Sequence, residues 1–286
     1  GLYSMADQGA FLMIGLPKGG QTLDDVRAIL LEEITKLRNG DFSDKLIPAI
    51  INNTRLNLQK SYESNRSRAN YYVDAFVNGQ DWADVVAQLG RLEKITKDDV
   101  VRVANKYFGD NNYAAIYKRQ GDDPNELKLA KPQLTPIAMN RDASSKFLQE
   151  IQNSKVEPIE PVFVDYDKDL TRLSAKNDIE LLYTRNITND MFRLTYVYDY
   201  GSNNDPLLVP ASSYITFLGT ATKNAQQIKD EFYNLACSYS INIGADRSYV
   251  TLTGLSENMP AAMALMEEVL ADAQVDTEAY NALIER

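Results

Sequence analysis

The sequence has 286 residues, and 44% of them are hydrophobic, which suffices for a packed core and argues against a disordered chain. The net charge of −10 disfavours nucleic acid as a partner, and no run of about 18 apolar residues predicts a membrane span. Cys237 is the single cysteine and histidine is absent. These counts exclude an intrachain disulfide, a histidine-ligated zinc site and a histidine-activated nucleophile within this chain.

The first elements are an apolar strand and two helices. The run AFLMIGL at residues 10–16 predicts a buried strand. A helix is predicted to begin after Thr22, because Asp25 lies three residues later as in a capping box, and to end at Gly40. A second, longer helix is predicted over residues 43–64.

The following residues repeat these signals. The stretches RSRANYYVDAFVNG and DWADVVAQLGRL each predict a helix. Thr96 and Asp99 have the spacing of a second capping box, so another helix is predicted to begin there. The stretch NYAAIYKR, residues 112–119, predicts a strand.

Residues 120–170 differ from the chain before and after them. Hydrophobic periodicity is lost except at residues 143–152, which predict one short helix. Half of the ten prolines lie in this stretch: Pro124, Pro132, Pro136, Pro158 and Pro161. We therefore predict an extended linker between two domains.

Residues 171–286 show an alternation of strands and helices. Two strands, IELLYTRN and MFRLTYVYDYG, are predicted to form a hairpin around ITND, followed by helices at 207–218 and 224–239. Strands SINIG and SYVTLTGL come next, and then a helix that begins at Pro260 and carries a stripe of methionines expected in the core. The fold class is predicted as α+β, with mixed or antiparallel sheets that have helices packed on one face.

The amino-acid sequences of two segments resemble those of one protein family. The N-terminal part of an insulinase-like (pitrilysin-type) zinc metalloprotease repeat is similar to MFRLTYVYDYGSNNDP followed by FLGTATKNAQQIKDEFYNLACSYSINIGADRSYVTLTGLSENMPAAMALMEEVL. FLMIGLPKGGQTLDDVRAILLEEITKL and ITKDDVVRVANKYFGDNNYAAIYK resemble the closing part of such a repeat. The resemblance implies that residues 1–119 end one repeat, that 120–170 form the linker, and that 171–286 begin the next repeat.

The resemblance also places the family's inverted zinc motif, H-x-x-E-H, on this chain. With Gly219 and Thr220 as the anchor, Pro210 and Tyr214 stand at the two histidine positions and Ser213 stands at the glutamate position. Proline has no ligand atom, neutral tyrosine is a poor zinc ligand, and serine is too weak an acid to act as the base. This repeat is therefore expected to be degenerate, with no catalytic residue and no metal ligand.

For the whole protein, the resemblance implies four repeats around a peptide-holding chamber, either in one chain or as two plus two in a dimer, with zinc in the first repeat only. The chain begins in an apolar strand and stops inside a helix, so we expect a piece of a longer protein. Its partners would be the remaining repeats of that protein and the peptide substrate, whose binding residues here are unknown. A periplasmic or cell-envelope location is the family's implication.

Two alternatives to a scaffold segment of an active zinc endopeptidase stay open. The chain could belong to a fully inactive relative that acts as a structural or assembly subunit, or it could be an unrelated peptide-binding module. Other patterns have simpler explanations than a site. The acidic pairs Asp24-Asp25, Asp98-Asp99, Glu32-Glu33 and Glu267-Glu268 suit helix starts or polar helix faces, and KGGQT at 18–22 lacks the spacing of a phosphate-binding loop.

Overall fold

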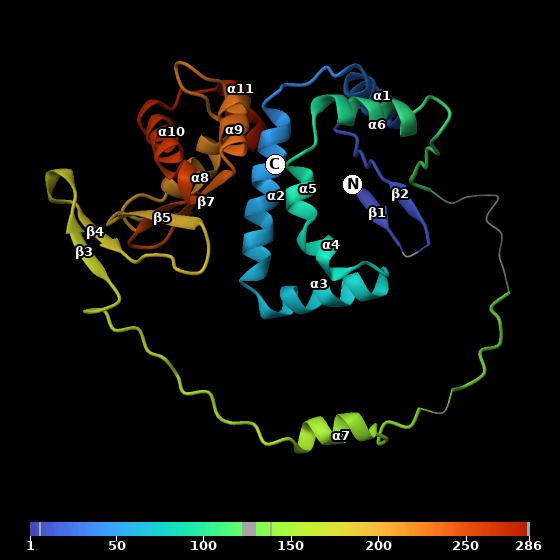
Figure 1. Cartoon of the computed structure of the whole chain (residues 1–286). Helices are drawn as coiled ribbons and strands as arrows, with labels where there is room; N and C mark the ends of the chain where they lie inside the picture. The colour runs from blue at the N-terminus through green and yellow to red at the C-terminus, as the bar shows by residue number, and fades with distance from the viewer. Residues whose placement is uncertain (6, 122–129, 138, 285–286) are drawn as a thin grey trace. The chain divides into compact units, whose positions relative to one another are not determined.

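The computed structural model describes residues 1–5, 7–121, 130–137 and 139–284 (Figure 1). They fall into two units, of which Gly1–Ala115 and Asn186–Arg286 together form the first and Ile116–Arg185 the second. All buried hydrophobic side chains of the described chain belong to the first unit. The division into three regions at residues 119 and 170 stays a prediction.

The helices of residues 1–115 begin and end where the capping signals predict. Thr22 and Asp25 form a capping box at the start of α1, and Gly40 ends this helix in the left-handed conformation with φ of 73°. Thr96 and Asp99 form the second capping box, at the start of α6. The helices of this region are α1 (Leu23–Asn39), α2 (Leu46–Tyr62), α3 (Asn65–Val77), α4 (Trp82–Val86), α5 (Gln88–Leu92) and α6 (Lys97–Tyr107).

Three predictions for this region were wrong. The strand over 10–16 is only β2 (Gly9–Phe11), which pairs with β1 (Leu2–Ser4); residues 13–16 have no strand partner in the described part of the chain, and Leu16 is 85% exposed. Residues 112–119 form no strand, because a strand requires a hydrogen-bonded neighbour and none of the described strands pairs with them. DWADVVAQLGRL breaks into α4 and α5 at Ala87 instead of forming one helix.

The sheet of residues 186–286 positions the rest of that region. Its strands β5 (Met191–Tyr198), β6 (Cys237–Ile243) and β7 (Ser248–Leu255) are antiparallel in the order β5-β7-β6. Helices α9 (Ala225–Asn234) and α10 (Met259–Asp272) pack against this sheet (Figure 1). The structure therefore has the predicted α+β class with antiparallel sheets.

The core lies between those helices and the inward residues of the strands. Leu252 in the central strand and Met266 in α10 are both 0% exposed, so the methionine stripe belongs to the core as predicted. The opposite face is polar, with hydroxyl pairs such as Thr195 with Thr251 across the strands. The buried cluster contains Ile228, Phe232, Cys237, Val250, Leu252, Ala262, Leu265, Met266 and Val269.

The predicted hairpin around ITND was wrong. Strand β4 (Glu180–Tyr183) pairs with β3 (Thr171–Ser174), whereas β5 pairs with β7, fifty or more residues later. The turn at 186–190 instead closes on itself, because the Asn186 side chain bonds Thr188 and the backbone of Met191. Helix α9 also ends earlier than predicted, at Asn234 rather than near 239, since Cys237 already pairs in β6.

Helix α2 joins the two sequence-distant parts of the first unit. Leu56 is buried with Ala236 and Leu255. The Asn53 side chain donates to the backbone oxygen of Tyr233 at 2.7 Å. In Figure 1, α2 runs beside α9.

The second unit contains few elements. Helix α7 (Lys146–Asn153) confirms the predicted short helix, and Ser145 caps it. The other elements are the β3–β4 pair and the 3-10 turn at Lys176–Asp178 between them. Of the predicted linker, residues 122–129 and 138 lie outside the described residues. None of the described helices, in either unit, is long and apolar enough to cross a membrane.

Candidate functional site

The candidate site is built on α8 (Leu208–Tyr214) and the turn after it, where the degenerate motif lies. The chain reaches α8 from β5 through a loop that needs glycine at position 201. A Cβ atom on Gly201 would lie 2.4 Å from the backbone oxygen of Ala245. Ser202 N donates to Gly244 O at 2.9 Å, which ties this loop to the β6–β7 turn. The start of α8 is thus fixed to the sheet by backbone contacts.

The three residues at the motif positions differ in how exposed they are and in what they contact. Pro210 lies in the first turn of α8 and is exposed, and Ser213 is exposed as well. Tyr214 is half-buried, and its hydroxyl both donates to the backbone oxygen of Asp276 at 2.6 Å and accepts from the amide of Asp276 at 2.9 Å. Its ring meets Tyr280 edge-on, with centroids 5.7 Å apart. Tyr214 is therefore committed to a contact with α11 (Thr277–Ile284).

This contact corrects, for Tyr214, the prediction that the rings of Tyr214 and Phe217 turn against strand residues such as Leu194 and Tyr196. Those two side chains instead pack against the buried core, and Tyr196 donates to Glu267 at 3.1 Å. Burial raises the pKa of Tyr196 to about 12, and the Glu267 contact adds to the effect. The core is complete without Tyr214, which leaves its ring free to face α11.

The motif residues do not fit a zinc ion. Pro210 offers no ligand atom, Ser213 offers only a hydroxyl, and the Tyr214 oxygen already holds two backbone hydrogen bonds. Over the ranges that the structure describes, no group of three or more cysteine or acidic side chains could hold a metal ion. Cys237 is equally unsuited, because burial raises the pKa of its thiol to about 11 and keeps it protonated.

After α8, the turn Gly219–Lys223 is locked onto α10 by one carboxylate. Glu268 accepts hydrogen bonds from the hydroxyls of Thr220 and Thr222, each at 2.9 Å, and pairs with Lys223 at 2.6 Å. Thr220 is only 7% exposed, so its hydroxyl needs this partner. The Asp272 carboxylate makes a second contact between α10 and this turn, because it accepts a hydrogen bond from the amide of Ala221 at 2.9 Å.

These contacts shift the ionisation of both charged groups. The bonds from Lys223, Thr222 and Thr220 hold the pKa of Glu268 at about 2, well below its ordinary value of 4.5. In turn Glu268 raises the pKa of Lys223. Sequence reasoning treated Glu267-Glu268 as a solvated pair and missed this role. The sequence signal for it was TATK at residues 220–223, which places two hydroxyl groups and a lysine next to a helix cap, where they can bind a carboxylate.

Replacing Glu268 with glutamine is expected to lower the melting temperature at pH 7, because the variant keeps an acceptor but loses the ion pair with Lys223. A carboxylate whose pKa is depressed on folding stabilises above its unfolded value and loses that contribution as the pH falls. The difference in melting temperature between wild type and Glu268→Gln should therefore shrink between pH 4.5 and about 2. Glu278→Gln, at an exposed position outside this cluster, is the control for scans over that range. An equal, pH-independent effect of both substitutions would contradict this role of Glu268.

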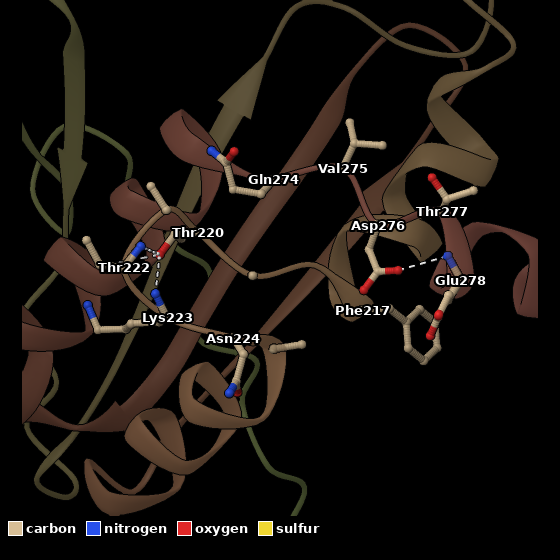
Figure 2. Close-up of a pocket in the computed structure, with 13 residues that line it drawn as sticks. Phe217, Thr220, Thr222, Lys223, Asn224, Gln274, Val275, Asp276, Thr277 and Glu278 are labelled. Carbon is tan, nitrogen blue, oxygen red and sulfur yellow. Dashed lines mark hydrogen bonds between the residues drawn. The ribbon is translucent and has the colours of Figure 1, made fainter.

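An open depression of about 640 Å³ lies beside this turn. Figure 2 shows the Thr220–Lys223 turn on one side and the Gln274–Glu278 segment on the other. Two polar side chains that line the depression already make structural hydrogen bonds. Asn224 caps α9, and the Asp276 carboxylate accepts from the amides of Glu278 and Ala279. The depression is thus a shallow surface between two structural segments, with no assembled catalytic constellation.

Comparison with known proteins gives structural neighbours only. No protein-family model and no curated protein matches the sequence. The inactive domain of a peptidase M16 from Pseudomonas fluorescens is 18% identical, with a TM-score of 0.37 over 40% of this chain and 29% of that one. The periplasmic protease PqqL from Escherichia coli is 13% identical, with a TM-score of 0.38 over 91% of this chain and 31% of that one. A mutant of the ferredoxin protease FusC, in complex with Arabidopsis ferredoxin, is 14% identical, with a TM-score of 0.37 over 91% of this chain and 32% of that one. The chain spans about a third of the length of these proteins.

Proposed function

We propose that this chain is a non-catalytic segment of an insulinase-like zinc endopeptidase and that it serves as scaffold and chamber wall for unfolded peptide. One observation carries the proposal. Helix α8 stands between β5 and the Gly219–Thr220 turn, where the resemblance puts the zinc-binding helix, yet Tyr214 holds α11 there and Pro210 and Ser213 are exposed residues that offer no zinc ligand. In this proposal residues 1–119 and 171–286 are parts of two successive repeats, and zinc belongs to an earlier repeat of the same protein.

The wall function is supported by an exposed apolar face on α3. Tyr72, Val73, Phe76 and Val77 share this face at helical spacing, and Phe76 is 87% exposed. Tyr72 also stacks on Trp82, with ring centroids 4.2 Å apart. Contiguous apolar surface of this kind is typical of interaction sites, and unfolded peptide offers matching side chains.

The charge of the chain narrows the class of peptide. The net charge of the chain is −10; α3 itself carries Arg66 and Arg68 as well as Asp74, and Asp81 caps α4. Complementary potentials favour apolar peptides that carry basic residues over acidic ones. The occupant we propose is therefore an unfolded, apolar and basic peptide segment.

Peptide binding without cleavage is the expected result for the isolated chain. The measurement is fluorescence anisotropy with a labelled, unfolded, basic apolar peptide, followed by mass spectrometry of the incubated peptide. Phe76→Ser should weaken binding by about fivefold to tenfold, because a large apolar contact is lost. Ile187→Ser is the control, at a position that is 88% exposed and outside the α3 face.

Equal binding by the Phe76 and Ile187 variants, or a preference for an acidic peptide of matched apolar content, would contradict the wall function. Specific cleavage by the isolated chain would contradict its non-catalytic nature. The parent protein gives an independent test. One H-x-x-E-H motif before this segment supports an active enzyme, whereas none anywhere in the parent supports a structural subunit.

A further inference from the structure

Helices α10 and α11 are consecutive, yet they are attached to the unit in different ways. Helix α10 has four buried residues and forms part of the core, whereas α11 has none. The link between them is exposed, with Val275 at 84%. Helix α11 packs against α8. Its attachment therefore rests on a small number of identifiable contacts.

Most of these contacts meet at Tyr214. Its hydroxyl holds the backbone oxygen and the amide of Asp276, and its ring meets Tyr280. The side chain of Asp276 accepts from the amides of Glu278 and Ala279, at 2.9 Å and 3.0 Å, and so caps α11. The residue that starts α11 is thus the residue that Tyr214 holds. Farther back, Gln274 N donates to Gly219 O at 2.9 Å.

We propose that residues 276–284 form a strap, that Tyr214 is its anchor, and that α11 leaves and rejoins α8 as one piece about a hinge at the exposed Val275, next to Gln274, which stays bonded to Gly219. The strap carries one wall of the depression, since Asp276, Thr277 and Glu278 line it. When the strap is docked this wall is in place, and when it is released the surface of α8 around Tyr214 is open to solvent. The strap thereby controls access to Tyr214, since Pro210 and Ser213 on the same helix are exposed even when it is docked.

The hydroxyl of Tyr214 can be removed without removing the ring. Tyr214→Phe keeps the edge contact with Tyr280 but loses both hydrogen bonds to Asp276. Amides in a segment that opens locally exchange in proportion to the population of the open state. Loss of two hydrogen bonds of ordinary net strength should raise that population by roughly tenfold or more.

The test is hydrogen–deuterium exchange of the full chain, followed by mass spectrometry of its peptides. Tyr214→Phe should speed exchange across 277–284 by about tenfold while leaving 259–272 in α10 unchanged. Tyr233→Phe is the matched control, because the structure gives its hydroxyl no hydrogen bond within the described residues and its exposed fraction is 43%. It should leave both regions as in the wild type.

A second variant separates the anchor from general packing. Tyr280→Ala keeps both hydrogen bonds to Asp276 but removes the ring that Tyr214 meets, so it should also speed exchange across 277–284 and spare α10. The proposal is overturned if Tyr214→Phe exchanges like the Tyr233→Phe control. It is equally overturned if α10 and α11 respond together, since that would show one rigid element rather than a strap.

Discussion

Replacing Leu252 with alanine is expected to lower the free energy of unfolding by about 2–5 kcal/mol, a large part of the roughly 5–15 kcal/mol that stabilises an ordinary domain. Leu252 is 0% exposed and lies in β7, the central strand, opposite Leu194 and Tyr239. Helices α9 and α10 close the core around it, so the cavity left by the substitution has little room to collapse.

Urea denaturation, followed by circular dichroism, measures this change. Leu207→Ala is the matched control, because Leu207 is the same residue type at 71% exposure just before α8. Its expected effect is within about 0.5 kcal/mol. Similar losses in both variants would show that the sheet and helices do not form the core described above.

Placing the complete zinc motif on α8 is expected to destabilise the chain without creating a tight zinc site. The variant is Pro210→His, Ser213→Glu and Tyr214→His. It loses the Tyr214 hydroxyl contacts and the ring contact with Tyr280, together about 2 kcal/mol. At about 2–4 °C per kcal/mol, the melting temperature should fall by about 4–8 °C.

Zinc affinity should stay weaker than micromolar in this variant. Catalytic zinc sites use three protein ligands with supporting hydrogen bonds, and the variant supplies two. The nearby carboxylate of Asp276 is occupied in capping α11. Isothermal titration with zinc chloride and a thermal melt measure both effects.

The double variant Pro210→His/Ser213→Glu, which retains Tyr214, is the control for stability. Both of its substituted positions are exposed, so its melting temperature should stay near that of the wild type. Submicromolar zinc binding by the triple variant, with an unchanged melting temperature, would mean that α8 is a zinc site lacking only its ligands.

Local signals predicted local structure well. The capping boxes at Thr22 and Thr96 fix helix starts through bonds within four residues, so the sequence alone locates them. Alternation along MFRLTYVY predicts a strand because the inward residues repeat every second position. Neither signal says which element lies next to it.

Partners at long sequence distance could not be predicted in the same way. The alternation in β5 is equally compatible with pairing to β4, which was predicted, and to β7, which occurs. The apolar run at 10–16 carries no information on whether another element covers it. Tyr214 illustrates the same limit at the site, because its partners Asp276 and Tyr280 lie more than sixty residues away.

The contact between α2 and the later sheet has a consequence for how the chain reaches its fold. Leu56 is fully buried only when Ala236 and Leu255 have been synthesised, about 180 and 200 residues later. Helix α2 therefore keeps an apolar face exposed until the later sheet has formed. Contacts between residues so far apart in sequence slow folding. The entropy of closing the intervening loop grows only with the logarithm of its length, about 0.6 kcal/mol for each doubling. The proline-containing stretch between the two parts can therefore vary greatly in length across related chains at little thermodynamic cost.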